Sequence, residues 1–104
     1  MNSDNDYKKS LNMVHDAGYD SLANAVIMQA LSDYKIAALR IVRNDFNIHE
    51  YSQMACKKYV REVPRFLKSD YFETLTKLNG QYLLDVTNNI LDKEYGVSKD
   101  ELLV

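Results

Sequence analysis

The residues of this chain that could perform catalysis are two histidines and one cysteine. His15 precedes Asp16 and His49 precedes Glu50, but neighbouring residues on a helix point in different directions. A helical metal site would need an HxxxH or ExxH spacing, and neither occurs in the sequence. The sequence therefore predicts neither a metal site nor a catalytic histidine–carboxylate pair.

Cys56 is the only thiol, and the adjacent Lys57 and Lys58 could lower its pKa. No histidine lies at a helix-compatible offset from Cys56, so a structural thiol is the simpler interpretation. The chain also lacks a glycine-rich phosphate loop and a GxSxG nucleophile motif. We therefore expect a protein that is not an enzyme and that uses no cofactor.

The most distinctive chemistry is a run of five basic residues against one acid, Glu62, between positions 57 and 69. Spacings of 4, 4 and 3 would align four of these residues along one face of an unbroken helix. They are Lys57, Arg61, Arg65 and Lys68, with Lys58 beside them. Large apolar residues occupy the other side, namely Tyr59, Val63 and Phe66.

Three interpretations of this basic row stay open. It can pair with an acidic protein surface, or it can contact phosphates while neighbouring tyrosines stack on unpaired bases. It can also be an ordinary solvated face that Glu62 and the acidic C-terminal third neutralise. Pro64 lies within the row, and a kink there would rotate Arg65 and Lys68 away from the other two cations.

Eight tyrosines in a chain without tryptophan are a second distinctive feature. Tyrosine combines a large apolar ring with a hydroxyl, which suits both core edges and binding surfaces. We expect Tyr34, Tyr59 and Tyr82 inside the protein. The surface candidates are Tyr7, Tyr19, Tyr51 and Tyr95, and Tyr51 or Tyr71 could anchor a partner beside the basic row.

Composition predicts an all-α fold. With three Gly and one Pro in 104 residues, the chain has too few turn residues for a many-stranded sheet, and its length fits one domain with a single core. We expect residues 1–104 to form one small bundle of four to five helices around a long Ala-rich central helix, with a loose or weakly helical tail at 97–104.

Hydrophobic spacing and stop signals locate these helices. The expected ranges are 4–17, 20 or 21 to 43, 47–62 with a kink or new start near Val63, 70–80, and 81–93 with a stop at Gly96. Asn47 with Glu50, and Asp70 with Glu73, have the spacing of capping boxes. Leu22, Val26 and Ile27 are expected to face inward on the central helix. Leu83, Leu84, Val86, Ile90 and Leu91 are expected to do so on the last helix.

The sequence gives no sign of a membrane or secreted protein. No apolar run reaches the roughly 18 residues of a membrane span, and the polar start MNSDNDYKKS lacks the apolar stretch of a secretory signal. A single cysteine fits a reducing compartment. We therefore expect a cytoplasmic protein with no membrane partner.

Two segments carry a resemblance to a known group of proteins. They are D-Y-K-x-A at 33–37 and F-L-K-S-D-Y-F-x-x-L-T-x-L-N-G-Q-Y-L at 66–83. The pattern resembles small uncharacterised helical proteins of Gram-positive phages and integrated mobile elements, over about half of the chain. Pro64 departs from that pattern, as does Asn79-Gly80-Gln81 where Asp-Gly-Glu is commoner. The resemblance implies a mobile genetic element as context and no particular activity.

In this context, the polarised charge, the surface tyrosines and the absence of catalytic motifs lead us to expect a non-enzymatic protein that binds a host protein with an acidic surface. A defence nuclease, inhibited in the manner of an anti-CRISPR protein, is one candidate partner. A nucleic-acid-binding accessory protein that uses the basic face of residues 57–68 is the first alternative. A homo-oligomerisation unit, for instance a dimer in which the Ala-rich helix packs across a two-fold axis, is the second.

Overall fold

The computed structural model describes residues 18–102, which form an all-α bundle. Its elements are α2 (Gly18–Arg43), α3 (Gln53–Leu67), α4 (Asp70–Leu75), α5 (Gly80–Tyr95) and a short 3₁₀ helix, η1 (Lys99–Leu102). The predicted fold class and the long central helix are confirmed. The helix expected at 4–17, together with Tyr7 and the side chain of Tyr19, lies outside the described residues.

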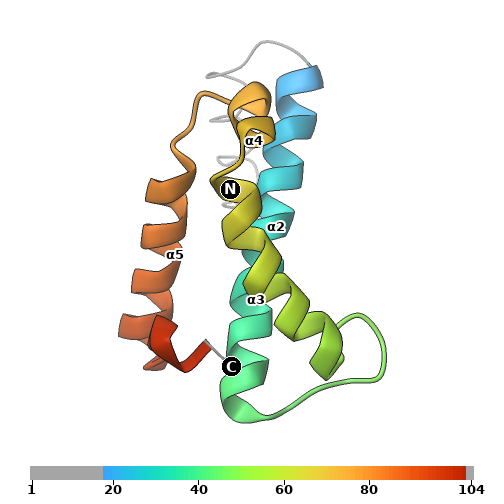
Figure 1. The fold of residues 1–104 in the computed structure, drawn as a ribbon, viewed down its shortest axis with the longest axis vertical. Helices are drawn as coiled ribbons and strands as arrows, with labels where there is room; N and C mark the ends of the chain where they lie inside the picture. Colours follow the sequence, from blue (N-terminus) through green and yellow to red (C-terminus); the bar gives the residue numbers. More distant parts are fainter. Residues whose placement is uncertain (1–17, 103–104) are drawn as a thin grey trace, which may run out of the picture.

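The bundle is organised around α2. In Figure 1, α3 lies in front of α2, α5 lies beside them on the left, and η1 returns toward α2, in agreement with the contacts between these elements. The core fills the space between the helices. Its buried members are Ile27, Tyr34, Ala38, Val63, Leu67, Phe72, Leu84, Leu91, Val97 and Leu102.

The inward face of α2 is centred on Ala23, Ile27, Tyr34 and Ala38, which recur at intervals of four and seven residues. Buried alanines let the neighbouring helices approach this face closely. The prediction that Leu22 faces inward is wrong: it is 66% exposed, and Val26 is exposed as well. Each residue turns the helix by about 100°, so Leu22 projects to the side of Ala23 that the neighbouring helices leave uncovered, whereas Asn24 on its other side is buried.

The predicted start of α3 at Asn47 is wrong by several residues. The helix begins at Gln53, and the hydroxyl of Ser52 caps it by accepting a hydrogen bond from the Ala55 N–H. Asn47 instead forms a local turn, in which its side-chain oxygen accepts from the N–H groups of His49 and Tyr51. Asn47 and Ser52 both accept hydrogen bonds from backbone N–H groups that would otherwise lack a partner. The spacing of Asn47 and Glu50 in the sequence does not distinguish such a turn from a helix cap.

Pro64 does not start a new helix, because α3 continues through it to Leu67. The expected cap at Asp70 is wrong by one residue: the Ser69 hydroxyl accepts from the Phe72 N–H and begins α4. The expected stop at Gly80 is also wrong. α4 ends at Leu75, and Gly80 is the first residue of α5.

Gly80 is required by close packing. A Cβ atom at this position would lie 1.8 Å from the carbonyl oxygen of Leu67, so only glycine lets the start of α5 touch the end of α3. Further along α5, Leu84 and Leu91 are buried as predicted. The predictions for Tyr82, which is 64% exposed, and for Val86, which is also exposed, are wrong.

The C-terminal segment is packed as far as Leu102. Gly96 ends α5 with a φ of 69°, as its predicted role as a stop requires. The Val97 N–H then donates to the carbonyl of Leu91, and Val97 and Leu102 are buried in the core. Of the two predicted forms of this tail, loose or weakly helical, the structure shows the second, because residues 99–102 form η1. Periodicity is weak in so short a segment, so the sequence did not indicate these two contacts.

Candidate functional site

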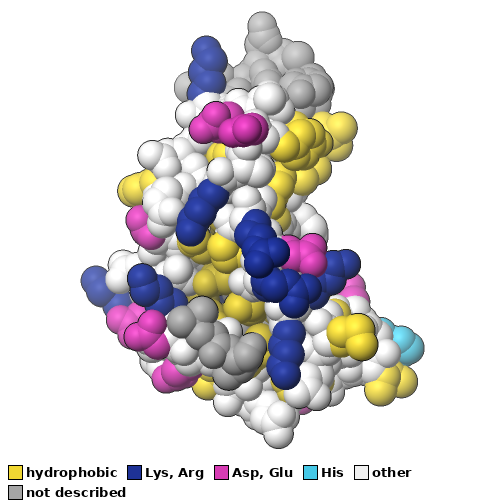
Figure 2. Space-filling model, in the orientation of Figure 1, with side chains coloured by type: hydrophobic (Ala, Val, Ile, Leu, Met, Phe, Trp, Pro, Cys, Tyr) yellow, Lys and Arg dark blue, Asp and Glu magenta, His cyan; other side chains and the backbone are white. Residues whose placement is uncertain are grey.

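The basic residues predicted to share a face do share one. Because α3 is continuous, Lys57, Arg61 and Arg65 recur every four residues on its exposed side, and Lys68 follows at its C-cap. Cys56, Val63 and Leu67 occupy the opposite, buried side. Figure 2 shows dark-blue side chains gathered over α3. We call Lys57, Lys58, Arg61, Arg65 and Lys68 the cationic face.

One member of the cationic face is paired within the protein. Arg61 lies 3.3 Å from the carboxylate of Glu62, and both side chains are about half exposed. An exposed pair of neighbours contributes little, typically below about 1 kcal/mol. The other four cations make no ion pair with a carboxylate of residues 21–102. Within this part of the chain, direct ion pairs therefore leave most of the positive charge of the face unneutralised.

The two predicted tyrosine anchors lie in different environments. Tyr71 is exposed on α4, just beyond the C-terminal end of the cationic face, with its ring centroid 6.3 Å from that of Phe66. Tyr51 is half-buried, and its hydroxyl donates to Asp33 on α2. Tyr51 was expected to face a partner. In the structure it instead holds residues 44–52, the connection between α2 and α3, against α2.

The other tyrosines sort by burial. Tyr34 is buried as predicted, and its hydroxyl donates to the side-chain oxygen of Asn88 on α5. Tyr59 is partly buried, with its ring centroid 6.0 Å from that of Tyr51. Tyr95 is exposed as expected. The rings nearest the first turns of α3 therefore pack on each other.

Two exposed apolar residues next to the cationic face were missed by the sequence reasoning. Ile48, in the connection between α2 and α3, is 88% exposed, and Met54, in the first turn of α3, is 83% exposed. A signal for Met54 was present, since it precedes Lys57, Lys58 and Arg61 by three, four and seven residues and so shares their helix face. For Ile48 the signal was an isolated apolar residue within a polar turn.

Three groups with raised pKa values, Tyr51, Cys56 and Tyr59, lie in the connection and the first turns of α3. Burial is the main cause that raises the pKa of Tyr51 to about 12, followed by its hydrogen bond to Asp33. Burial also raises the pKa of Cys56, against the opposing charge of Arg40. The predicted lowering of the Cys56 pKa by Lys57 and Lys58 is therefore not found. Cys56 is a buried thiol that contacts the Tyr51 carbonyl.

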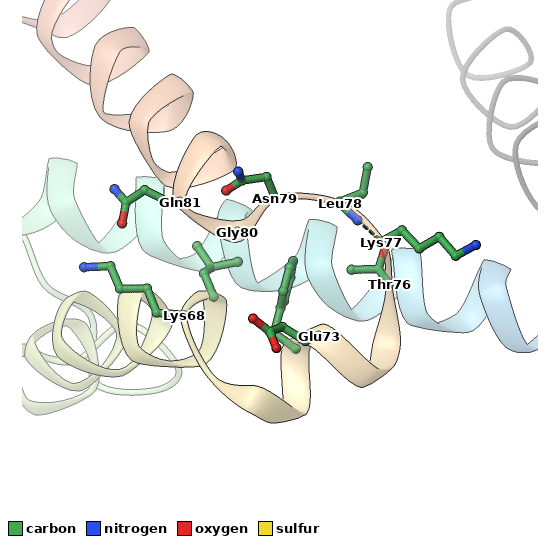
Figure 3. A pocket seen from close by; sticks show the side chains of 10 residues that line it. Lys68, Glu73, Thr76, Lys77, Leu78, Asn79, Gly80 and Gln81 are labelled. Atoms are coloured by element: carbon green, nitrogen blue, oxygen red, sulfur yellow. Dashed lines mark hydrogen bonds between the residues drawn. The ribbon is translucent and has the colours of Figure 1, made fainter.

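A hollow of about 560 Å³ lies between the end of α3, α4 and the start of α5. In Figure 3, Lys68 and Gln81 lie on one side of it, Glu73 lies below, and Lys77 extends away on the other side. The polar side chains are dispersed around the rim, so no nucleophile–base pair is assembled. Nowhere within residues 18–102 do three or more His, Cys, Asp or Glu side chains gather closely enough to hold a metal ion.

No protein-family model matches this chain, and no curated protein or solved structure matches it significantly. The fold and surface define a small all-α bundle that carries a cationic helix face. Among the helices of residues 18–102, none combines the length and apolar character needed to cross a bilayer.

Proposed function

We propose that this protein is a non-enzymatic binding module that docks on an acidic surface of another protein through the cationic face of α3. The observation that supports the proposal is the alignment of the cations on a helix whose opposite side is buried in the core. Because the core fixes the rotation of α3, the charges keep their direction without a partner. Such preorganisation lowers the entropic cost of binding.

The aromatic rings near the cationic face favour a protein partner over unpaired nucleic acid. Arg61 and Arg65 lie at the centre of the face, and a guanidinium can form two parallel hydrogen bonds with a carboxylate or with a phosphate, so the arginines by themselves fit either partner. Nucleic-acid binding through unpaired bases would need aromatic rings open to stacking. Tyr51 and Tyr59, the rings nearest the first turns of α3, instead pack against each other. Tyr71 is exposed beyond the other end of the face, and a single ring makes a poor platform for successive bases.

The resemblance of residues 33–37 and 66–83 to phage and mobile-element proteins supports a finer proposal. The partner would be a host protein in the bacterial cytoplasm, for example a defence nuclease that this protein inhibits in the manner of an anti-CRISPR protein. A homo-oligomer formed through the alanines of α2 has less support, since Ala23, Ala37 and Ala38 are buried within the chain itself.

The test is affinity capture from a Gram-positive bacterial lysate with two variants of equal net charge. The first variant replaces four cations of the face with glutamine, as Lys57→Gln, Arg61→Gln, Arg65→Gln and Lys68→Gln. The matched control replaces four cations elsewhere, as Arg43→Gln, Lys77→Gln, Lys93→Gln and Lys99→Gln, all of them exposed. Circular dichroism verifies that both variants remain helical.

We expect a host protein that is retained by the wild type and by the control but is lost from the face variant, followed by direct binding of that purified protein in calorimetry. Equal retention by the two variants would overturn the proposal. Binding of a labelled oligonucleotide with a log–log salt slope of about −3 to −4, as four phosphate contacts predict, and without a retained protein would favour the nucleic-acid alternative.

A further inference from the structure

Ile48 and Met54 are the two most exposed large hydrophobic residues that the structure describes, at 88% and 83%. Single exposed apolar side chains are common on protein surfaces. These two stand out because both lie at the N-terminal end of the cationic face. In Figure 2, yellow side chains lie at the lower right beside the dark-blue group over α3.

The position of Met54 follows from the register of α3. Met54 lies one helical turn before Lys57 and Lys58 and two turns before Arg61, so its side chain leaves the helix on the same face. A methionine at 83% exposure contributes nothing to the core. Its thioether adapts to irregular apolar surfaces, which is why methionine recurs at binding surfaces.

The connection that carries Ile48 is held in shape on both sides of this residue. The Asn47 side chain accepts from the N–H groups of His49 and Tyr51, and the Asn47 N–H donates to the Tyr51 carbonyl. These bonds close a turn that includes Ile48, whose side chain points outward from it. The Tyr51 hydroxyl then fixes the turn to Asp33 on α2, at 2.8 Å.

Arg40 adds a second attachment between α2 and the connection. Its guanidinium donates to the Asp45 carbonyl at 3.0 Å and lies 5.4 Å from the centre of the Tyr51 ring. Asn44 begins the connection with a φ of 53°, which turns the chain sharply after α2. The connection therefore presents Ile48 from a structured turn, and little conformational entropy is lost when Ile48 is buried by a partner.

From this arrangement we infer that Ile48 and Met54 form an apolar anchor, and that the partner surface is an apolar pocket with carboxylates on the side that meets the cationic face. The inference rests on the proposed function and names the partner's chemistry. Charge complementarity defines the acidic part of that surface, and the two apolar side chains define the pocket. Buried apolar anchors beside charged contacts commonly dominate the energy of protein interfaces.

The surrounding charges favour a protein as the occupant. Glu50 lies in the connection between Ile48 and Met54, and Glu62 lies on the exposed side of α3. An anionic bilayer would repel both carboxylates, and Glu50 lies between the two apolar residues that would have to insert. A protein surface can place a compensating donor opposite each one. For nucleic acid, Ile48 and Met54 offer no aromatic face on which a base could stack.

The experiment selects short random peptides by display on the immobilised full-length protein. An enriched peptide is then synthesised, and its affinity is measured by fluorescence anisotropy. We expect enriched peptides that combine Asp or Glu with a large apolar residue. Ile48→Ser and Met54→Gln should each weaken binding of such a peptide at least about tenfold. Leu22→Ser, which removes an exposed apolar residue of α2 away from this surface, should leave the affinity unchanged.

The outcomes separate the two proposals. Acidic peptides without an apolar preference, weakened by the four-glutamine variant of the cationic face but not by Ile48→Ser or Met54→Gln, would overturn the anchor and leave the proposed function standing. Enriched peptides without acidic residues, or no enrichment, would overturn both. Phosphatidylglycerol vesicles and oligo(dT) are tested in the same way as the peptides. Binding that depends on Ile48 but is seen only with the vesicles, or binding only to oligo(dT), would also overturn both proposals.

Discussion

The hydroxyl of Tyr51 donates a 2.8 Å hydrogen bond to the carboxylate of Asp33, which lies eighteen residues earlier in the chain. This bond joins the last part of the α2–α3 connection to the middle of α2. The ring of Tyr51 also lies beside the guanidinium of Arg40 and the ring of Tyr59. Tyr51 therefore couples the position of Ile48 to the central helix.

The first prediction concerns the ionisation of Tyr51. Burial, the hydrogen bond to Asp33 and nearby negative charge raise the pKa of Tyr51 to about 12 from its ordinary value of 10.0. Between these values the unfolded chain has lost the proton while the folded protein keeps it. This contribution to stability is thus complete below pH 10.0 and is lost as the pH rises toward about 12.

The measurement is the tyrosine ¹³Cζ chemical shift against pH, with the Tyr51 signal assigned by its loss in Tyr51→Phe. Asp33→Asn should lower the pKa of Tyr51, because it removes the charge of the hydrogen-bond partner, although burial keeps the value above 10.0. Asp92→Asn on α5 is the matched control and should leave the titration of Tyr51 in place. An unchanged pKa in Asp33→Asn would contradict the assigned cause.

The second prediction concerns Gly80. Gly80→Ala and Gly80→Asn should both lower the free energy of unfolding by about 1–3 kcal/mol, because overpacking forces the backbones apart. The two residues should cost about the same, because the atom that collides with the Leu67 carbonyl oxygen is the Cβ atom, which both of them have. This cost exceeds the gain in helix propensity, which is about 1 kcal/mol for Ala. Urea unfolding followed by circular dichroism measures it.

Gly96 supplies the control for this prediction, since no atom lies within 4 Å of the Cβ that a substitution would add there. Its φ of 69° is costly for Ala but less so for Asn, which tolerates the left-handed conformation. Asn should therefore cost less than Ala at Gly96. At Gly80 both residues should be similarly destabilising. Equal stability of Gly80→Ala and the wild type would refute the close contact with Leu67.

The third prediction is that Pro64→Ala stabilises the protein. Proline has no N–H, so the carbonyl of Val60 lacks the usual donor four residues later within α3. Alanine supplies this donor, which favours the helix. Proline also restricts the unfolded chain, and losing that restriction offsets part of the gain, so the free energy of unfolding should rise by about 1–3 kcal/mol in total. Lys58→Ala, an exposed change in the same helix, should alter stability by less than about 0.5 kcal/mol. A loss of stability in Pro64→Ala would show that α3 requires the proline.

The fourth prediction concerns the link between α2 and α5. Tyr34→Phe removes the hydroxyl that donates to Asn88 and leaves a partly buried acceptor unpaired. The free energy of unfolding should fall by about 1–3 kcal/mol, the usual cost of such a group. Tyr95→Phe changes an exposed hydroxyl and serves as the control. Urea unfolding measures both variants. If Tyr34→Phe and Tyr95→Phe unfolded at the same urea concentration, the hydrogen bond from Tyr34 to Asn88 would contribute nothing to stability.

Local signals in the sequence were sufficient for several features of this protein. The alanines and apolar spacing of residues 21–43 predict a long helix, and Gly96 predicts the end of the last one, because propensity and the left-handed conformation are properties of short segments. The alignment of Lys57, Arg61 and Arg65 also follows from spacing alone once α3 is helical. These features depend on residues within a few turns of each other.

Only the tertiary structure decided which sides of the helices are covered. Tyr82 carries the same side-chain chemistry as Tyr34, yet one is exposed and the other is buried, because the neighbouring helices pack against different parts of α5 and α2. The close approach of Gly80 to Leu67 and the bond from Tyr51 to Asp33 likewise join residues on different elements. A periodic pattern gives the width of an apolar face, whereas its rotation toward the core is set by the packing of all the helices together.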